Sequence, residues 1–136
     1  MGFEHHLTAR FYEIDRAGIV FYGRFYEYAH AALEELLAEI FGRADAIFES
    51  LGFGMPLVHS EADYFAPTRM GDKLKITVEI ERLGTKSVTF AYHIASEAGQ
   101  KRATVKLVHC FVQMETFTSI PAPDVFLDGL RRLDLI

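Results

Sequence analysis

The sequence predicts an α+β protein in which one antiparallel sheet wraps around a long central helix. Three observations lead to this prediction: a broad apolar stripe of helical period over residues 23–41, alternating strand patterns on both sides of it, and the lack of a linker sequence that would divide the chain. The chain has 136 residues, half of them apolar, which suits one ordinary domain with a sizeable core. We therefore expect a single domain over residues 1–136.

The first two expected elements are a strand and the long helix. Residues 3–13 alternate in the manner of a strand, and the segment Asp15-Arg16-Ala17-Gly18 breaks that alternation. A helical period follows from about Gly23 to Phe41, and Gly42 supplies a C-terminal stop. The apolar stripe of this helix consists of Phe25, Tyr28, Ala29, Ala32, Leu33, Leu36, Leu37 and Ile40. Its breadth indicates a helix that a sheet encloses.

The rest of the chain is expected to be β-rich. A short second helix is predicted over residues 43–51, and a weak helical turn near residues 125–133. Four further strands are predicted over residues 56–65, 73–82, 86–96 and 101–117. The order of one strand, a long helix and four strands favours one antiparallel sheet around the helix.

Composition and charge exclude several classes of function. The net charge is −5 and no Lys/Arg cluster exceeds a pair, so we expect no nucleic-acid partner. No apolar run reaches the length of a membrane span, and we expect no membrane partner. The N-terminal residues lack the pattern of a secretory signal, and the single cysteine cannot form an internal disulfide; both points favour the cytoplasm. The histidines match no metal-site spacing, so no metal is expected.

The densest chemistry lies directly before the long helix. There a carboxylate, Asp15, is followed by a glycine turn at Gly18 and an aromatic run. A helix start offers unpaired N–H groups and a positive dipole end, which can hold a developing oxyanion. A carboxylate a few residues upstream could act as a nucleophile or as a general base for water. An aspartate at such a place is more often a turn or cap residue, and residue types alone do not exclude that role.

Two motifs resemble one known family. Residues 15–22 (DRAGIVFY), followed by an aromatic helix, resemble the signature of the hotdog-fold 4-hydroxybenzoyl-CoA thioesterase family. A second match comes at the right distance in residues 55–59 (MPLVH), 63–67 (DYFAP) and 71–74 (GDKL), and leans towards the branch that includes 1,4-dihydroxy-2-naphthoyl-CoA thioesterases. The resemblance covers nearly the whole chain to about residue 117 and implies the hotdog fold.

The resemblance implies an acyl-CoA thioesterase that needs no cofactor, since CoA is part of the substrate. Asp15 would be the catalytic carboxylate, as nucleophile or general base. Gly18, Ile19 and the amides up to Tyr22 would bind and polarise the thioester carbonyl. Tyr22 stands where some members have histidine, and a tyrosine there suits an orienting hydrogen-bond donor better than a base. Aromatic and aliphatic acyl groups both stay open, with an aromatic acid favoured.

Three more residues are expected to bind substrate. His59 could form a hydrogen bond with a substrate hydroxyl or carbonyl, although a satisfied strand histidine is an equal alternative. Lys86 and Ser87 begin a strand where the family offers a basic run to the CoA phosphates. A solvated surface cation is the alternative interpretation of Lys86.

Two other functions stay open. An acyl-thioester dehydratase or hydratase would use a histidine and a carboxylate on the central helix, where His30 and Glu34 lie one turn apart, deep in an otherwise apolar helix. A non-catalytic acyl-binding module would give Asp15 no chemical role. In each case we expect a homodimer or homotetramer, because one curved sheet leaves strand edges and a face to be covered.

Overall fold

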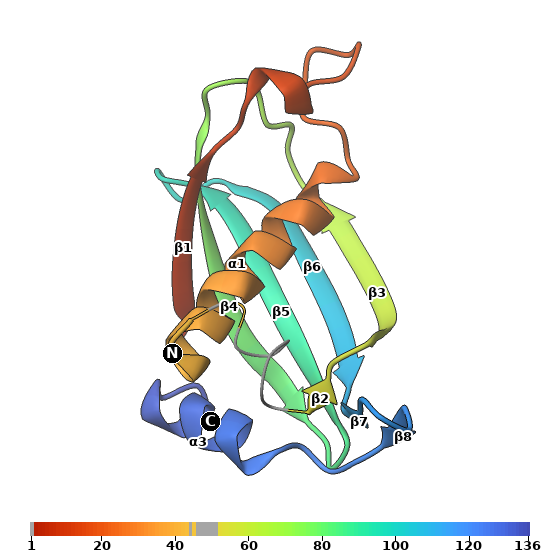
Figure 1. The fold of residues 1–136 in the computed structure, drawn as a ribbon. Helices are drawn as coiled ribbons and strands as arrows, with labels where there is room; N and C mark the ends of the chain where they lie inside the picture. The colour runs from red at the N-terminus through yellow and green to blue at the C-terminus, as the bar shows by residue number, and fades with distance from the viewer. Residues whose placement is uncertain (1, 44, 46–51) are drawn as a thin grey trace.

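A five-stranded antiparallel sheet curves around helix α1 (Arg24–Phe41) in the computed structural model, which describes residues 2–43, 45 and 52–136 (Figure 1). In spatial order the strands are β1 (Phe3–Thr8), β4 (Lys73–Leu83), β5 (Ser87–Ser96), β6 (Lys101–Cys110) and β3 (Leu57–Tyr64). Every neighbouring pair is antiparallel. The predicted sheet around a long helix is therefore confirmed.

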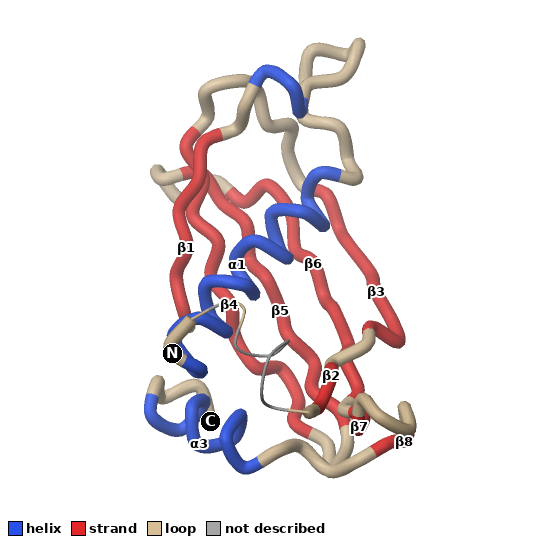
Figure 2. The backbone as a smooth tube through the Cα atoms, in the orientation of Figure 1, coloured by secondary structure: helices blue, strands red, loops and turns tan. Residues whose placement is uncertain are grey.

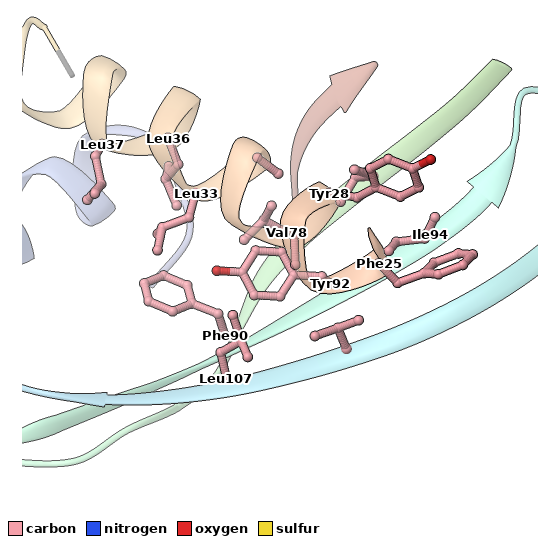
Figure 3. Close-up of a cluster of buried hydrophobic side chains, with 14 of the residues drawn as sticks. Phe25, Tyr28, Leu33, Leu36, Leu37, Val78, Phe90, Tyr92, Ile94 and Leu107 are labelled. Atoms are coloured by element: carbon pink, nitrogen blue, oxygen red, sulfur yellow. The ribbon is translucent and has the colours of Figure 1, made fainter. Parts of the chain in front are cut away.

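Helix α1 buries the stripe that its sequence period predicts. All eight predicted residues are buried, and they pack on apolar side chains of the sheet such as Val78, Phe90 and Leu107 (Figure 3). The helix ends at Gly42, whose N–H donates to the Ala38 carbonyl oxygen over 2.8 Å with a φ of 88°, a conformation that glycine adopts without strain. Helix α1 thereby covers one face of the sheet along the length of its buried stripe.

The first predicted strand is too long. Strand β1 ends at Thr8, and the Ala9 N–H then donates to the Asp72 carbonyl oxygen. Residues Phe11–Glu13 form a 3₁₀ turn instead of strand. The reason lies in Glu13, whose carboxylate accepts the Arg10 N–H over 2.6 Å and so closes a turn that alternation alone does not reveal.

The last predicted strand, over residues 101–117, is also too long. It ends at Cys110, and β7 (Val112–Gln113) then joins β2 (Phe53–Gly54) and β8 (Thr118–Ser119) in a second, three-stranded sheet within the described part of the chain. The tail helix, α3 (Asp124–Arg132), packs against α1. The predicted helix over residues 43–51 lies for the most part outside the described residues.

The two ends of the large sheet carry different features (Figure 2). At one end, called the Asp15 end, lie the loop of residues 9–23 and the turn of residues 65–72. At the opposite end, called the β2 end, lie the small sheet and the β4–β5 turn. Among the described helices, none is long and apolar enough to cross a membrane.

Candidate active site

The loop that carries Asp15 is a tight turn closed by its own backbone. The Asp15 N–H donates to the Ile19 carbonyl oxygen over 2.9 Å, and the Gly18 N–H donates to the Asp15 carbonyl oxygen over 3.0 Å. Gly18 has a φ of 82°, which a residue with a side chain would adopt only under strain. Carboxylate oxygen Oδ1 of Asp15 accepts the Ala17 N–H over 2.8 Å, while Oδ2 has no partner among the described residues. The aspartate is thus a turn residue with one oxygen still available.

Some backbone N–H groups in and next to this loop donate hydrogen bonds, and others have no acceptor among the described residues. The Val20 N–H donates to the Thr68 carbonyl oxygen over 2.8 Å, and the Phe21 N–H donates to the Glu13 carbonyl oxygen over 2.9 Å. The N–H groups of Tyr22 and Gly23 donate to no acceptor in the described part of the chain, and they directly precede α1. Of the amides expected to polarise a carbonyl, those of Ile19 and Tyr22 therefore stay available among the described residues, and the helix start adds that of Gly23.

Tyr22 is oriented by a residue from the far end of β3. Its backbone carbonyl oxygen accepts a hydrogen bond from the Tyr64 hydroxyl over 2.9 Å, while its own ring is 64% exposed and packs on Phe21 at 4.4 Å between centroids. Burial raises the pKa of the Tyr64 hydroxyl, which keeps that group protonated and able to donate. The Tyr64 contact fixes the peptide unit whose other side is the Gly23 N–H.

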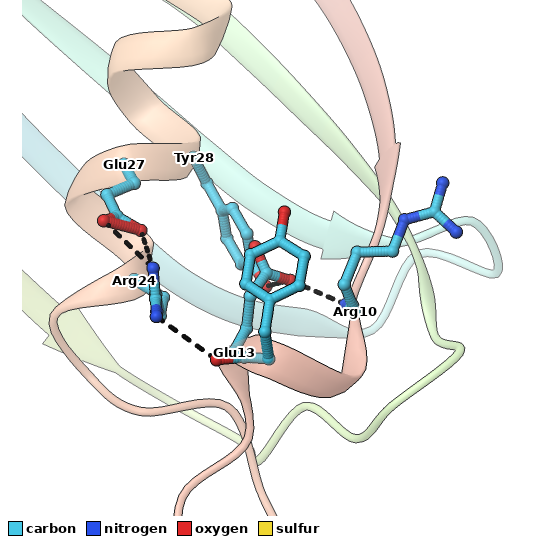
Figure 4. A network of polar contacts seen from close by, with 6 residues as sticks. Arg10, Glu13, Arg24, Glu27 and Tyr28 are labelled. Atoms are coloured by element: carbon cyan, nitrogen blue, oxygen red, sulfur yellow. Dashed lines mark hydrogen bonds and ion pairs between the residues drawn. The ribbon is translucent and has the colours of Figure 1, made fainter.

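The buried carboxylate of Glu13 accepts hydrogen bonds beside the first turns of α1 (Figure 4). The Oε1 atom of Glu13 accepts the Arg10 N–H over 2.6 Å and the Tyr28 hydroxyl over 2.9 Å, and burial together with Glu13 raises the pKa of Tyr28. Arg24 donates to the Tyr12 carbonyl oxygen over 3.2 Å and lies over the Tyr12 ring. Sequence reasoning missed this network, because the strand pattern of residues 3–13 carries no signal for it.

A second polar cluster holds the neighbouring turn of residues 65–72. The Arg102 side chain is largely buried, and its Nη1 donates to the Pro67 carbonyl oxygen over 2.9 Å and to Asp72 Oδ2 over 2.8 Å. Arg102 keeps the pKa of the Asp72 carboxyl below its usual range, with help from the Arg69 N–H. In the same turn the Thr68 carbonyl oxygen accepts the Val20 N–H, so this cluster also helps to hold the Asp15 loop in place.

A cavity of about 700 Å³ opens at the β2 end, and it is called the β2 pocket below. Its walls are mainly apolar and include Leu33, Leu37, Phe53, Met55, Pro56 and Phe117. Such a size and lining are typical of small-molecule sites. Met55 and Pro56 of the lining precede β3, whose eight residues span about 25 Å to the Asp15 end of the sheet. On α1 the lining reaches to His30, seven residues after Gly23, so most of the pocket lies toward the β2 end.

Comparison with known proteins identifies the family. The sequence model of the thioesterase-like superfamily matches residues 9–130. The chain belongs to this superfamily. A 1,4-dihydroxy-2-naphthoyl-CoA hydrolase of Synechococcus elongatus is 30% identical over 123 residues, which cover 90% of each chain. The hydrolase of the same name from Thermosynechococcus vestitus is 26% identical over 121 residues, 89% of this chain and 83% of that protein.

Solved structures agree with this assignment. A 1,4-dihydroxy-2-naphthoyl-CoA thioesterase from Synechocystis superposes with a TM-score of 0.87 at 26% identity, with 98% of both chains covered. A Staphylococcus aureus protein in complex with CoA superposes with a TM-score of 0.88 at 16% identity, over 97% of this chain and 83% of that one, which supports the fold alone. The predicted hotdog fold and the predicted class of enzyme, a thioester hydrolase, are confirmed at the level of the family.

The residues predicted for the site of this thioesterase-like chain fall into two groups. Asp15, Gly18, Ile19 and Tyr22 share the loop described above. Lys86 is the last residue of the β4–β5 turn and Ser87 begins β5, at the opposite end of the sheet. Each group forms a compact segment, but the fold of one chain does not bring the two together.

The remaining predicted residue, His59, lies on β3. Its cross-strand partner is Val108, which alternates with the inward-facing Leu107 and His109, so His59 faces away from α1. There its Nε2 lies 3.3 Å from Glu61 Oε1. Within one chain His59 therefore contacts neither the Asp15 loop nor the lining of the β2 pocket.

The residues weighed for a dehydratase line the β2 pocket. His30 Nε2 lies 3.3 Å from Glu34 Oε1, and both side chains are about 60% exposed. The prediction that they sit deep in the helix is wrong, because they lie on its outer side, beyond the sheet's cover. Across residues 2–43, 45 and 52–136, no three side chains of His, Cys, Asp or Glu gather as a metal site requires.

Proposed function

We propose that this chain hydrolyses the CoA thioester of an aromatic acid to the free acid and CoA. The observation that carries the proposal is the juxtaposition, on one short segment, of the Asp15 carboxylate with the unpaired amides of Tyr22 and Gly23. The names of the curated relatives, which are hydrolases of 1,4-dihydroxy-2-naphthoyl-CoA, support an aromatic acyl group.

The amides would act on the thioester carbonyl oxygen. As the acyl carbon becomes tetrahedral, negative charge develops on this oxygen, and the Tyr22 and Gly23 N–H groups at the positive end of α1 stabilise it. Asp15 either attacks the acyl carbon through Oδ2 or removes a proton from an attacking water. The carbon–sulfur bond then breaks and the CoA thiolate leaves. On the nucleophilic route this step leaves an anhydride between Asp15 and the acyl group, and water hydrolyses it to the free acid and restores the Asp15 carboxylate. Overall, the hydroxyl of one water joins the acyl group and its proton ends on CoA.

The complete site would need two copies of the chain. Strand β3 is an edge of the large sheet and nearly all of its residues are exposed. Self-pairing of two β3 strands about a two-fold axis is antiparallel, and it would place the Tyr64 end of one protomer beside the Leu57 end of its partner. The Asp15 loop of one protomer would then face the β2 pocket of the other. This arrangement would bring the mainly apolar β2 pocket of one protomer to the Asp15 loop of the other.

Exposed aromatic residues support a homodimer of this kind. Around the Asp15 loop, Phe11, Tyr12, Tyr22 and Phe65 expose between 55% and 79% of their surface. Apolar patches of this sort commonly mark interfaces. Lys86 of the partner would also approach the loop from the β2 end, where it could bind a CoA phosphate.

An Asp15→Asn variant tests the chemistry. The amide oxygen of asparagine can still accept the Ala17 N–H, so the loop should stay folded while the attacking oxygen or base is lost. We expect thiol release from aromatic acyl-CoAs to fall roughly 10²–10⁴-fold or more. Asp128→Asn, at an exposed position on α3 away from β3 and the Asp15 loop, is the matched control and should retain activity. Hydrolysis by Asp15→Asn at the parent rate would refute the proposal.

A second candidate function has one observation in its favour. His30 and Glu34 form a close pair on the lining of the β2 pocket, and such a pair could shuttle a proton in an acyl-thioester dehydratase or hydratase. A 3-hydroxyacyl-CoA assayed beside the aromatic thioesters separates the two functions, because only an acyl group with a 3-hydroxyl can lose water to form an enoyl thioester. A dehydratase would form the enoyl thioester, seen by its absorbance, without release of free thiol.

A further inference from the structure

One buried histidine in the β2 pocket has no role in the proposed chemistry. His109 belongs to β6 and faces α1 with only 7% of its surface exposed, edge-on to Phe90 at 5.7 Å between ring centroids. It is also part of the lining of the β2 pocket. Most of the other lining residues are apolar, so this imidazole is the pocket's deeply buried polar group within the described residues.

A backbone contact determines which nitrogen of His109 carries the proton. Its Nδ1 lies 2.8 Å from the Met55 carbonyl oxygen, which can only accept a hydrogen bond. Nδ1 is therefore protonated, and in the neutral ring Nε2 presents a lone pair. Burial lowers the pKa of His109, which keeps the ring neutral at physiological pH.

The Nε2 atom has no partner. It is buried and accepts no hydrogen bond from any described residue, whereas His30 at the same pocket is exposed and pairs with Glu34. A buried acceptor without a donor keeps the free-energy cost of its lost hydration. Buried polar groups that stay unpaired in the free protein are commonly completed by a ligand or an ordered water.

We propose that His109 Nε2 determines specificity by accepting a hydrogen bond from a hydroxyl group on the ring of the acyl group. This rests on the proposed function, since it takes the β2 pocket as the acyl site. The contact requires a donor on the ligand, so a hydroxyl fits and a methoxy group at the same position does not. Glu34 and Asp45, which also line the pocket, disfavour a carboxylate there by like-charge repulsion. His109 thus affects which acyl group the pocket prefers, whereas hydrolysis of the thioester takes place at Asp15.

A matched substrate series tests this role. The probes are 2-naphthoyl-CoA, its monohydroxy positional isomers and the corresponding methyl ethers. For the parent protein we expect one hydroxy isomer to exceed both the unsubstituted thioester and its own methyl ether in kcat/KM by roughly 10-fold to 100-fold. An equal response to hydroxyl and methoxy groups would overturn the proposal, because a donor on the protein would treat them alike.

Asparagine is the informative replacement of His109. In His109→Asn the side-chain amide can still donate to the Met55 carbonyl oxygen, but no atom remains at the place of Nε2. We expect the preference for the hydroxy isomer to fall to about 3-fold or less, with turnover of 2-naphthoyl-CoA retained. His93→Asn, at an exposed position on β5 outside the pocket, is the control and should keep the full preference. Retention of the preference in His109→Asn would contradict the assignment.

Binding measurements separate this inference from the proposed activity. With Asp15→Asn as background, the hydroxy isomer and its methyl ether can be compared by calorimetry, without any turnover. Loss of the binding preference on addition of His109→Asn would support the role of Nε2 even if no thioester is hydrolysed. Equal binding of both probes to the Asp15→Asn protein would refute it even if hydrolysis is observed.

Discussion

The hydroxyl of Tyr64, at the end of β3, donates a hydrogen bond to the backbone carbonyl oxygen of Tyr22, 2.9 Å away. These residues are 42 positions apart in the sequence, and their contact links the edge strand to the turn that precedes α1. Because a peptide unit is planar, a fixed Tyr22 carbonyl also fixes the direction of the Gly23 N–H on the other side of that unit. The edge strand thus positions a donor of the proposed oxyanion site.

Removal of the Tyr64 hydroxyl should lower kcat markedly and the free energy of unfolding only slightly. We expect Tyr64→Phe to reduce kcat roughly 10-fold with little change in KM, and to lower the free energy of unfolding by only about 1 kcal/mol. Steady-state kinetics and urea unfolding measure both quantities. Tyr12→Phe is the control, because it removes an exposed hydroxyl that forms no hydrogen bond with any described residue. An unchanged kcat in Tyr64→Phe would mean that the contact is only structural.

Loss of the Glu13 carboxylate should destabilise the fold. Glu13→Ala leaves the Arg10 N–H and the Tyr28 hydroxyl without their acceptor, both in or near the protein interior. We expect the free energy of unfolding to fall by about 2–4 kcal/mol, as measured by urea titration. Glu27→Ala removes an exposed carboxylate from the same region and should cost less than about 1 kcal/mol. Equal losses in the two variants would show that burial of Glu13 has no energetic consequence.

Acid should weaken the protein through Asp72. The Arg102 guanidinium lowers the pKa of Asp72 in the folded state below its value in the unfolded chain, near 4. The unfolded state therefore binds more protons in that range, so this carboxylate contributes stability above about pH 4 and loses it as the pH falls through the folded pKa. The difference in unfolding free energy between the parent and Asp72→Asn should shrink from pH 6 to pH 2. A constant difference would contradict this linkage.

The contact between α3 and α1 should not tolerate a methyl group at Gly129. A Cβ atom there would lie 2.4 Å from Ile40 Cγ2, although alanine normally stabilises a helix interior relative to glycine. We expect Gly129→Ala to lower the free energy of unfolding by about 1–3 kcal/mol because of this overlap. Thermal or urea unfolding measures the effect. Asp128→Ala, exposed on the same helix, should change stability by less than about 1 kcal/mol, and a stabilised Gly129→Ala protein would refute the packing.

Subunit mixing should reveal whether the site is shared between protomers. Met114 lines the β2 pocket and is 54% exposed, so Met114→Trp should fill the pocket without damage to the core. We expect Asp15→Asn and Met114→Trp to be inactive alone, and an equal mixture to regain about a quarter of the parent activity after exchange, because each heterodimer holds one intact site. No recovery in heterodimers shown to form would place pocket and carboxylate in the same chain.

Local sequence patterns were sufficient for the framework of the protein. The apolar stripe of α1 was predicted residue by residue, since helical periodicity alone decides which side chains can face a sheet. The loop from Asp15 to Tyr22 was found from its motif, because a turn glycine, a carboxylate and a helix start are all short-range features. The predicted bounds of the three middle strands agree with the structure to within one residue. The first and last predicted strands extend too far, since Glu13 and the turn after Cys110 depend on hydrogen bonds that alternation does not encode.

Only the tertiary structure decided which side chains join the elements by hydrogen bonds and which buried polar atoms have no partner. The pairs Glu13–Tyr28, Asp72–Arg102 and Tyr22–Tyr64 join residues 15, 30 and 42 positions apart, and a sequence pattern carries no signal for contacts across such distances. The tautomer of His109 likewise depends on the Met55 carbonyl, 54 positions away. Periodicity determines which face of an element is buried, but hydrogen bonds between elements depend on the packing that folding completes.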